Sequence, residues 1–344
     1  MTTDAVGGVW TYASELRAQL TAAGVDVVLA TLGPQAPPDA DSPYLPCRLE
    51  WEPEPWEDVA AAGDWLLGLA AQDGADLVHL NGFAHGALPW PVPVVVAGHS
   101  CVLSWHEAVR GRPPGPEWGR YRAAVAAGLH GADAVVAPTG AMAAALQRHY
   151  GLGQRPQVIA NGVSPHAAAP VTHVDRAPLV LGAGRLWDEA KGLDALDAAA
   201  ADMTWPVVVA GDAGGRQASH ARMLGALPRD ELRTLMGRAA IFAHPARYEP
   251  FGLVVLEAAL AGCALVLGDI DSLRELWDGA AVFVAPGDAA ALAAACERLC
   301  GDDELRGILA GRAGERAWRY DAATMASAYV RLYEQRCDLH TVSA

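Results

Sequence analysis

The sequence predicts an α/β protein with two domains, each built on a parallel β-sheet. Its 344 residues are long for one compact domain and comfortable for two. Short apolar runs alternate with amphipathic helical patterns along the chain, which is typical of strands joined by crossover helices. A Pro- and Ala-rich stretch, residues 163–177, shows neither the hydrophobic pattern of a strand nor that of a helix. We therefore expect two Rossmann-like domains that face a central cleft, over residues 1–165 and 175–320, and a C-terminal helix and tail over residues 321–344.

The first half contains a series of strand-like and helical segments. The expected strands are Val25–Thr31, Asp76–Leu80, Pro93–Gly98, Asp133–Ala137 and Gln157–Ala160. The expected helices include Val9–Ala23, Trp56–Ala71 and Thr139–Tyr150. No apolar strand opens the series, because Met1–Asp4 is short and polar. Our hypothesis is that the chain begins inside its first strand, and a stunted first strand is the alternative.

The second half repeats the scheme. Its expected strands are Pro178–Gly182, Pro206–Ala210, Ala240–His244, Ala264–Gly268 and Ala280–Ala285. Helical patterns follow most of them, and a last helix is expected over Ala322–Gln335.

Composition excludes several classes of protein. The net charge of −15 provides no basic field for a nucleic-acid partner. No apolar stretch reaches the length of a membrane span, so we expect no stable membrane insertion. The six scattered cysteines form no C-x-x-C pair, which favours free thiols over zinc ligands. These features, and a start without a signal-peptide pattern, predict a cytoplasmic protein.

The strongest motif surrounds Gly252, which begins a helix directly after a polar turn. The N–H groups of Phe251, Gly252 and Leu253 and the helix dipole predict an anion site there. Glu249 and Glu257 lie on either side of this helix start, and carboxylates accept hydrogen bonds from sugar hydroxyls. The alternative is that both acids are structural, one favouring the helix dipole and one buried.

A second motif follows the first strand of the second half. Gly182 and Gly184 allow a tight turn, after which Arg185 and Lys191 are predicted to converge on phosphate oxygens. Lys191 is the only lysine among 25 basic side chains, so its compact ammonium stands out in a chain that otherwise uses arginine. A dinucleotide fingerprint is rejected, because Trp187 stands where the third glycine would be.

Two features of the first half are candidates for a ligand site. Gly7 and Gly8 precede a predicted helix and allow a ligand to approach the backbone, although a simple turn is the alternative. His99 follows an apolar strand, where it has either a functional or a structural role. His79, His85 and His106 lie in the same region and are weaker candidates.

Asp269 and Asp271 form a D-x-D pattern, which in another transferase fold holds a metal under a diphosphate. Here the pattern precedes a predicted helix, with Asp271 or Ser272 as its N-cap. We therefore favour a structural role and expect no metal.

The motifs together resemble family 4 glycosyltransferases of the GT-B fold. The residues that carry the resemblance are Gly7, Gly8, His99, Arg185, Lys191, Glu249 and Glu257. The resemblance implies transfer of a sugar from a UDP- or GDP-linked donor to an acceptor hydroxyl, with retention of configuration and without an essential metal or other cofactor. It leaves the acceptor open between a glycan, a lipid-linked molecule and a small molecule. It also implies that the last helix crosses back to the first domain.

The resemblance assigns a role to each residue of the second half. Arg185 and Lys191 would neutralise the leaving diphosphate, and the amides of residues 251–253 would hold phosphate and sugar oxygens. Glu249 would bind donor-sugar hydroxyls, and Glu257 would bind the ribose.

The remaining roles are spread over both halves. Gly8 would approach the phosphate, and His99 would contact the sugar. Leu224 and Gly225 would cradle the base.

Two rival functions stay open. One is a metal-dependent transferase that uses Asp269 and Asp271, and the other is a nucleotide-sugar-binding protein without turnover. For the leading function we predict that Lys191→Ala and Glu249→Gln abolish transfer and hardly change the melting temperature.

Overall fold

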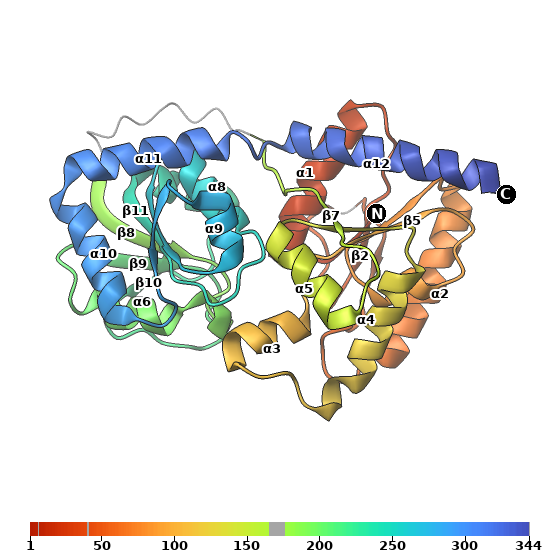
Figure 1. Cartoon of the computed structure of the whole chain (residues 1–344), viewed down its shortest axis with the longest axis horizontal. Helices are drawn as coiled ribbons and strands as arrows, with labels where there is room; N and C mark the ends of the chain where they lie inside the picture. Colours follow the sequence, from red (N-terminus) through yellow and green to blue (C-terminus); the bar gives the residue numbers. More distant parts are fainter. Residues whose placement is uncertain (6, 40, 165–175, 344) are drawn as a thin grey trace. The chain divides into compact units, whose positions relative to one another are not determined.

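The chain folds into two α/β units in the computed structural model shown in Figure 1, which describes residues 1–5, 7–39, 41–164 and 176–343. Unit 1 comprises Met1–Gly162 and Ala322–Ala344, and unit 2 comprises Val163–Asp321. The last helix of the chain therefore belongs to the same unit as the N-terminal half.

Unit 1 contains parallel strands with helices between them. The strands are β1 Thr2–Thr3, β2 Ala30–Leu32, β3 Tyr44–Leu45, β4 Val78–Leu80, β5 Val94–Ala97, β6 Ala134–Ala137 and β7 Gln157–Val158. The helices are α1 Gly8–Ala22, α2 Trp56–Asp73, α3 Val102–Arg110, α4 Gly119–Gly131, α5 Gly140–Tyr150 and α12 Ala322–Ser343. The strands pair in the orders β1-β2-β3 and β4-β5-β6-β7. Hydrogen bonds from Asn81 to Thr2 place β1 beside β4.

The expected strand Val25–Thr31 is wrong at its start, because the structure begins β2 at Ala30. Its partner β1 has two residues, so the paired ladder can begin only at Ala30. The ammonium of Met1 donates to Val28 O at 2.8 Å.

Unit 2 contains one six-stranded parallel sheet. Its strands are β8 Ala177–Ala183, β9 Val207–Ala210, β10 Arg222–Met223, β11 Ala239–His244, β12 Ala264–Gly268 and β13 Ala281–Val284. Its helices are α6 Leu193–Ala200, α7 Arg229–Arg238, α8 Leu253–Leu260, α9 Asp271–Trp277, α10 Ala289–Gly301 and α11 Asp303–Ala317. The order β10-β9-β8-β11-β12-β13 is that of a Rossmann fold. The direction of strand addition reverses between β8 and β11, which is where such sheets bind ligands.

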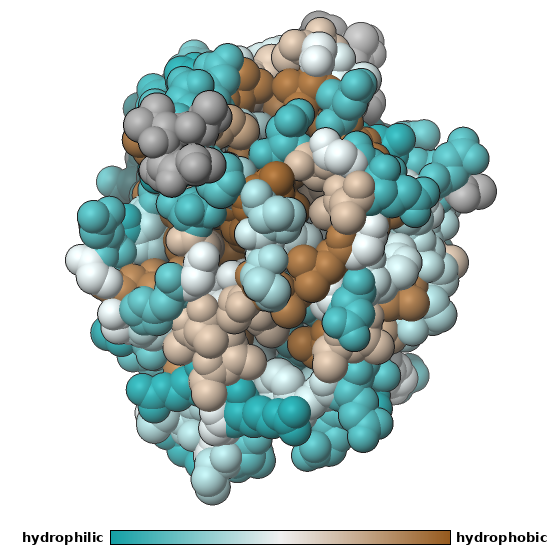
Figure 2. Space-filling view, turned by 90° about the vertical axis from the view of Figure 1, so that its right-hand side faces the viewer, coloured by the Kyte–Doolittle hydropathy of each residue, from teal (hydrophilic) through white to brown (hydrophobic). Residues whose placement is uncertain are grey.

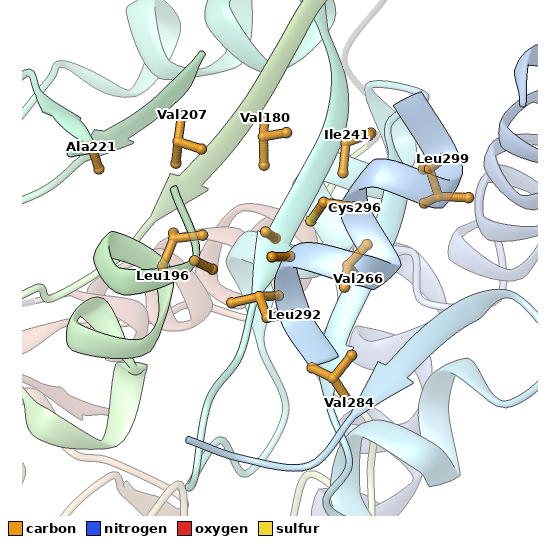
Figure 3. Packing of buried hydrophobic residues seen from close by; sticks show 14 of the residues in the cluster. Val180, Leu196, Val207, Ala221, Ile241, Val266, Val284, Leu292, Cys296 and Leu299 are labelled. Carbon is orange, nitrogen blue, oxygen red and sulfur yellow. The ribbon is translucent and has the colours of Figure 1, made fainter. Parts of the chain in front are cut away.

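The core of unit 2 explains why these apolar runs form strands. Figure 3 shows Val180, Ile241 and Val266 from three neighbouring strands together with Leu292 and other side chains of α10. Each is almost inaccessible to solvent. Burial of one such side chain stabilises the fold by about 1.5–3 kcal/mol.

The expected linker over residues 163–177 is ordered at both of its ends. Val163 forms a β-bridge with Asp321, and Ala177 begins β8. The Arg176 guanidinium donates to Ala239 O at 2.8 Å, which anchors the chain just before β8. Residues 165–175 lie outside the described residues.

The last helix extends past the predicted end at Gln335 and packs against α1. Tyr329 and Leu332 are buried, and the ring of Tyr329 lies 6.2 Å from that of Tyr12. The buried face of α12 is therefore part of the core of unit 1.

Polar and apolar side chains share the molecular surface. On the face shown in Figure 2, hydrophobic residues gather near the middle and hydrophilic residues surround them. Among the described residues, no helix combines the length and the hydrophobicity needed to cross a bilayer. All six cysteines are free thiols, and Cys101, Cys263 and Cys296 are buried.

Candidate functional site

The candidate site of unit 2 lies at the carboxyl ends of β8 and β11, where the strand order reverses. Gly184 follows β8 with a φ of 148°, which favours glycine. The chain then forms a 3₁₀ turn, Glu189–Lys191, whose N-cap Asp188 accepts a hydrogen bond from Ala190 N at 3.0 Å. Arg247 N in the loop after β11 donates to Ala190 O at 2.7 Å. This bond holds the two loops together.

Lys191 and Glu249, predicted as separate ligand-binding groups, form an ion pair. Lys191 Nζ lies 2.9 Å from Glu249 Oε2 and 3.4 Å from Tyr248 O. The two side chains are only 8% and 14% exposed. The lysine therefore points at the loop that leads into α8.

His244, which sequence analysis did not single out, completes this cluster. Its Nε2 lies 3.2 Å from Glu249 Oε2, the same oxygen that Lys191 contacts, and its side chain is 3% exposed. Burial by itself would raise the pKa of Glu249, but the Lys191 ammonium and the hydrogen bond from His244 hold this pKa well below its usual range. The carboxylate is therefore charged near neutral pH. The sequence could have indicated His244, because it is the last residue of a predicted strand. His99 was chosen as a candidate because it follows such a strand.

The start of α8 has the geometry of an anion site. Gly252 is the N-cap with a φ of 87°, a conformation that L side chains rarely adopt. Among the described residues, none accepts a hydrogen bond from the amides of Phe251, Gly252 or Leu253. Ser272 Oγ donates to Glu249 O at 2.5 Å and fixes the preceding turn. Three amides and the positive end of the helix dipole are thus available to an anion.

Glu257 is engaged by two arginines from α7. Its Oε1 lies 2.9 Å from Arg229 and 3.4 Å from Arg233, and its side chain is 12% exposed. No sequence motif points to these two arginines, because they lie more than 20 residues from Glu257 in another helix. Glu257 Oε1 is therefore already charge-paired, which a role in binding ribose must accommodate.

Arg185 does not join the Lys191–Glu249 pair. Its guanidinium lies 3.9 Å from Asp188 Oδ2 and 5.6 Å from the centre of the Trp187 ring, and its side chain is 41% exposed. Arg185 and Lys191 thus contact different partners, and their convergence on one anion stays a prediction.

Leu224 and Gly225 directly follow β10 and lie beside the end of β9. Leu224 N donates to Val209 O at 2.9 Å, and Gly225 O accepts from Gly211 N at 2.8 Å. A Cβ on Gly211 would lie 1.8 Å from Gly184 O, so the loops after β8 and β9 approach closely. The weaker prediction of a base-binding segment thus falls beside the main site of unit 2.

The candidate site of unit 1 lies at the ends of β1, β4 and β5. Gly7 has a φ of 72° and is the N-cap of α1, and Gly8 is the first residue of this helix. His99 follows β5, and its Nε2 lies 2.9 Å from Asn81 Oδ1. Its ring packs on the ring of Tyr12 at 4.4 Å. Burial lowers the pKa of His99 to about 4, so the imidazole is neutral near pH 7.

His79 has a structural role. Its Nε2 lies 3.4 Å from the Tyr12 hydroxyl and its Nδ1 lies 2.6 Å from the Tyr333 hydroxyl. Burial lowers the pKa of His79 well below its usual value. Both ring nitrogens therefore serve to join α1, β4 and α12.

The D-x-D pair has partners of its own. Asp269 Oδ2 lies 2.7 Å from Arg274 Nη2, and Asp271 is the first residue of α9. The predicted N-cap is wrong, because Ile270 occupies this position and the Ser272 hydroxyl bonds to the loop that carries Glu249. In the described part of the chain, no three His, Cys, Asp or Glu side chains form a group that could hold a metal.

Comparison with protein families gives two matches that together cover most of the chain. A model described as Glycosyltransferase Family 4 matches residues 6–167, and one described as Glycosyl transferases group 1 matches residues 177–302. The phosphatidyl-myo-inositol mannosyltransferase of Mycolicibacterium smegmatis is 34% identical over 203 residues, which are 53% of each chain. A glycogen synthase of Mycobacterium tuberculosis is 39% identical over 115 residues, 33% of this chain and 28% of the relative. The chain thus spans about half the length of the curated relatives that it matches first.

Solved structures show the same fold over nearly the whole chain. A sucrose-phosphate synthase from Thermosynechococcus elongatus has a TM-score of 0.78 at 21% identity, covering 97% of this chain and 95% of its own. HepE from Anabaena in complex with UDP-glucose has a TM-score of 0.76 at 19% identity, covering 97% and 100%.

Proposed function

Because the chain belongs to glycosyltransferase family 4 and has the GT-B fold, we propose that it transfers a sugar from a nucleotide diphosphate sugar to an acceptor hydroxyl. The observation that carries this proposal is the buried Lys191 ammonium, held by Glu249 beside the amino end of α8. A buried cation and a row of amides in the same loop region suit a diphosphate that gains charge as it leaves.

The donor in this proposal is a hexose linked to UDP or GDP. The relatives named mannosyltransferases and the HepE complex with UDP-glucose support a hexose donor. These relatives do not distinguish UDP from GDP, so the proposal includes both nucleotides.

In this proposal the residues of unit 2 bind the donor. The amides of Phe251, Gly252 and Leu253 and the ammonium of Lys191 receive the diphosphate. Glu249 Oε2 is occupied by Lys191 and His244, so the other carboxylate oxygen is the one that accepts from sugar hydroxyls.

Three further residues complete the donor site in the proposal. Arg185 is partly exposed and lies over the Trp187 ring, and in the proposal its guanidinium moves from there onto the phosphate when donor binds. Glu257 binds the ribose through Oε2, since Oε1 faces Arg229 and Arg233. Leu224 and Gly225 lie along the base.

Unit 1 contributes Gly7, Gly8 and His99. The two glycines keep the start of α1 free of side chains, and His99 offers a neutral ring nitrogen to a sugar hydroxyl.

The proposed reaction proceeds on one face of the sugar, with retention of configuration. The bond between the anomeric carbon and the diphosphate oxygen breaks, and its electron pair leaves with the diphosphate. The acceptor oxygen bonds to the anomeric carbon from the same side, and its proton passes to the leaving diphosphate oxygen. The residues of unit 2 lower the barrier because they stabilise the charge that develops on the leaving group.

The proposal requires no metal and places the protein in the cytoplasm. The acceptor stays open between a glycan, a lipid-linked molecule and a small molecule.

A donor screen tests the proposal without knowledge of the acceptor. The full chain is incubated with a panel of UDP- and GDP-hexoses, and slow release of UDP or GDP is measured. We expect hydrolysis of one donor, lost in Lys191→Met. If no nucleotide diphosphate is released from any donor, with or without candidate acceptors, the proposal of a transferase fails.

Two controls address the rival functions. Unchanged turnover after thorough chelation excludes a transferase that uses Asp269 and Asp271. A rise of the melting temperature with sugar nucleotides, without any turnover, favours a binding protein.

A further inference from the structure

Asn81 makes hydrogen bonds that define the orientation of its side-chain amide. It follows β4 directly, and its backbone N–H donates to Thr2 Oγ1 at 2.9 Å. Its side-chain Nδ2 donates to Thr2 O at 2.7 Å. A backbone carbonyl can only accept, so Nδ2 faces β1 and Oδ1 faces the opposite way.

The oxygen of this amide faces His99. Asn81 Oδ1 lies 2.9 Å from His99 Nε2, and an amide oxygen can only accept. His99 Nε2 must therefore carry a hydrogen. In a neutral imidazole only one nitrogen carries a hydrogen, so Nδ1 of His99 has a free lone pair.

The surroundings of His99 keep the ring in this state. Burial lowers the pKa of His99, which disfavours a second proton on the ring. The Tyr12 ring packs against it edge to face and restricts its rotation. Among the described residues, none is hydrogen-bonded to His99 Nδ1. By contrast, both nitrogens of the neighbouring His79 are used by tyrosines.

We propose that Asn81 is a positioning residue that holds His99 in the tautomer with hydrogen on Nε2, so that Nδ1 presents a hydrogen-bond acceptor to the ligand. The chain of contacts runs from the Thr2 carbonyl through the Asn81 amide to the imidazole. The short strand β1 thus has a role in the site, because it fixes which end of the amide faces the histidine.

The inference deepens the proposed function and rests on it for the identity of the ligand. A lone pair accepts from a sugar hydroxyl and repels a carboxylate, so a donor sugar with a hydroxyl at this point is accepted and an acidic sugar is excluded. The state of the ring, however, is a property of unit 1 by itself. It is measured without any ligand or turnover.

Nuclear magnetic resonance of the full chain tests the tautomer. Histidine labelled with ¹⁵N is incorporated, and the His99 signals are assigned by their loss in His99→Gln. We expect the wild type to carry hydrogen on Nε2 at pH 7. Hydrogen on Nδ1 of His99 would overturn the proposal.

Two variants at position 81 separate positioning from a merely structural role. Asn81→Ala removes the acceptor, and we expect a mixture of both tautomers and a fall of kcat/KM by about tenfold, the effect of one hydrogen bond. Asn81→Asp restores an acceptor and adds a charge, so we expect the Nε2–H tautomer to return and the pKa of His99 to rise. An unchanged tautomer in Asn81→Ala would contradict the proposal.

Thr2→Val is the matched control. It removes the hydroxyl that Asn81 N contacts and keeps the Thr2 carbonyl that orients the amide. We expect the wild-type tautomer in this variant, and a mixture would show that loosening of β1 is the real cause. A wild type with the expected tautomer and no turnover of any sugar nucleotide would refute the proposed function and leave the role of Asn81 intact.

Discussion

Each unit places a histidine at the carboxyl end of a parallel strand, but the two histidines face different partners. His244 of unit 2 faces the carboxylate of Glu249, which also binds the Lys191 ammonium. His99 of unit 1 faces the amide of Asn81. The carboxyl end of a parallel strand thus carries a charged cluster in one unit and a neutral cluster in the other. The fold determines where each cluster lies, and the residue that faces the histidine determines whether the cluster is charged or neutral.

This difference matches the two tasks that we propose for the units. A leaving diphosphate gains negative charge, and a buried cation beside helix amides stabilises it. A sugar hydroxyl carries no charge, and a neutral lone pair suffices to orient it. Variants of the two clusters therefore test whether unit 2 depends on charge and unit 1 on neutrality.

The largest effect is expected when the charged cluster is broken. Lys191→Met should lower turnover by about 10²–10³ because it removes a cation from the leaving group. It should also destabilise unit 2 by about 3 kcal/mol, since it leaves the buried Glu249 carboxylate without its ammonium. The sequence alone predicted that the melting temperature hardly changes. Because the structure buries this ion pair, we expect a lower melting temperature instead. Donor hydrolysis and thermal unfolding measure the two effects.

Two matched variants control this experiment. The double variant Lys191→Met with Glu249→Gln should regain much of the lost stability and none of the activity, because no buried charge is then left alone. Arg185→Met should lower turnover with an unchanged melting temperature, since the Arg185 side chain is 41% exposed and its ion pair with Asp188 is long, at 3.9 Å. Equal melting temperatures in Lys191→Met and Arg185→Met would argue against a buried pair.

The second prediction concerns acid. The pKa of His99 is about 4 in the folded chain and 6.5 when exposed. Between these two pH values the unfolded chain binds a proton that the folded chain does not bind. Lowering the pH from 6.5 to 4 should therefore destabilise unit 1 by up to about 3 kcal/mol. The pKa of Glu249 is lowered from 4.5, so its contribution to unit 2 is lost only as the pH falls below 4.5.

Hydrogen exchange of peptides from each unit measures this difference between pH 7 and pH 4. Loss of protection should begin in unit 1, and His99→Gln should weaken its pH dependence. If unit 2 opens first on acidification, the contrast between a neutral and a charged cluster is wrong.

A smaller effect is expected from neutralising the second acid of unit 2. Glu257→Gln keeps the shape of the side chain and removes the charge that faces Arg229 and Arg233. We expect the KM for donor to rise by about tenfold, because a hydrogen bond to a charged group is worth roughly 1.5–3 kcal/mol. The corresponding change in unit 1, Tyr12→Phe, removes a hydroxyl that lies 3.4 Å from His79 and is hydrogen-bonded to Tyr329, and it should leave the KM for donor unchanged. Steady-state kinetics of both variants provide the comparison.

The smallest effect is expected at the D-x-D pair. Asp269→Asn breaks an ion pair with Arg274 in which both side chains are about half exposed, and such pairs contribute little. Turnover and melting temperature should both match the wild type, with and without chelator. A large loss of turnover that added metal restores would revive the metal-dependent mechanism.

The patterning of the sequence predicted most of the strands and helices. It misplaced the start of β2, because pairing with the two-residue β1 is a tertiary constraint. It missed β3 and β10, which have two residues each and show no periodicity. It also left Arg176 in the linker, although this side chain is bonded to the start of β11.

The sequence by itself determined which local features exist: a glycine that begins α8, a single lysine after β8, and a histidine at each of two strand ends. These follow from residue type and spacing, which act over a few residues. Only the tertiary structure decided which charges meet, because Lys191 and Glu249 are 58 residues apart and are joined by two loops at one sheet edge. The partners His244, Arg229 and Asn81 were decided in the same way, since the burial and hydrogen bonding of a side chain depend on what the fold brings next to it.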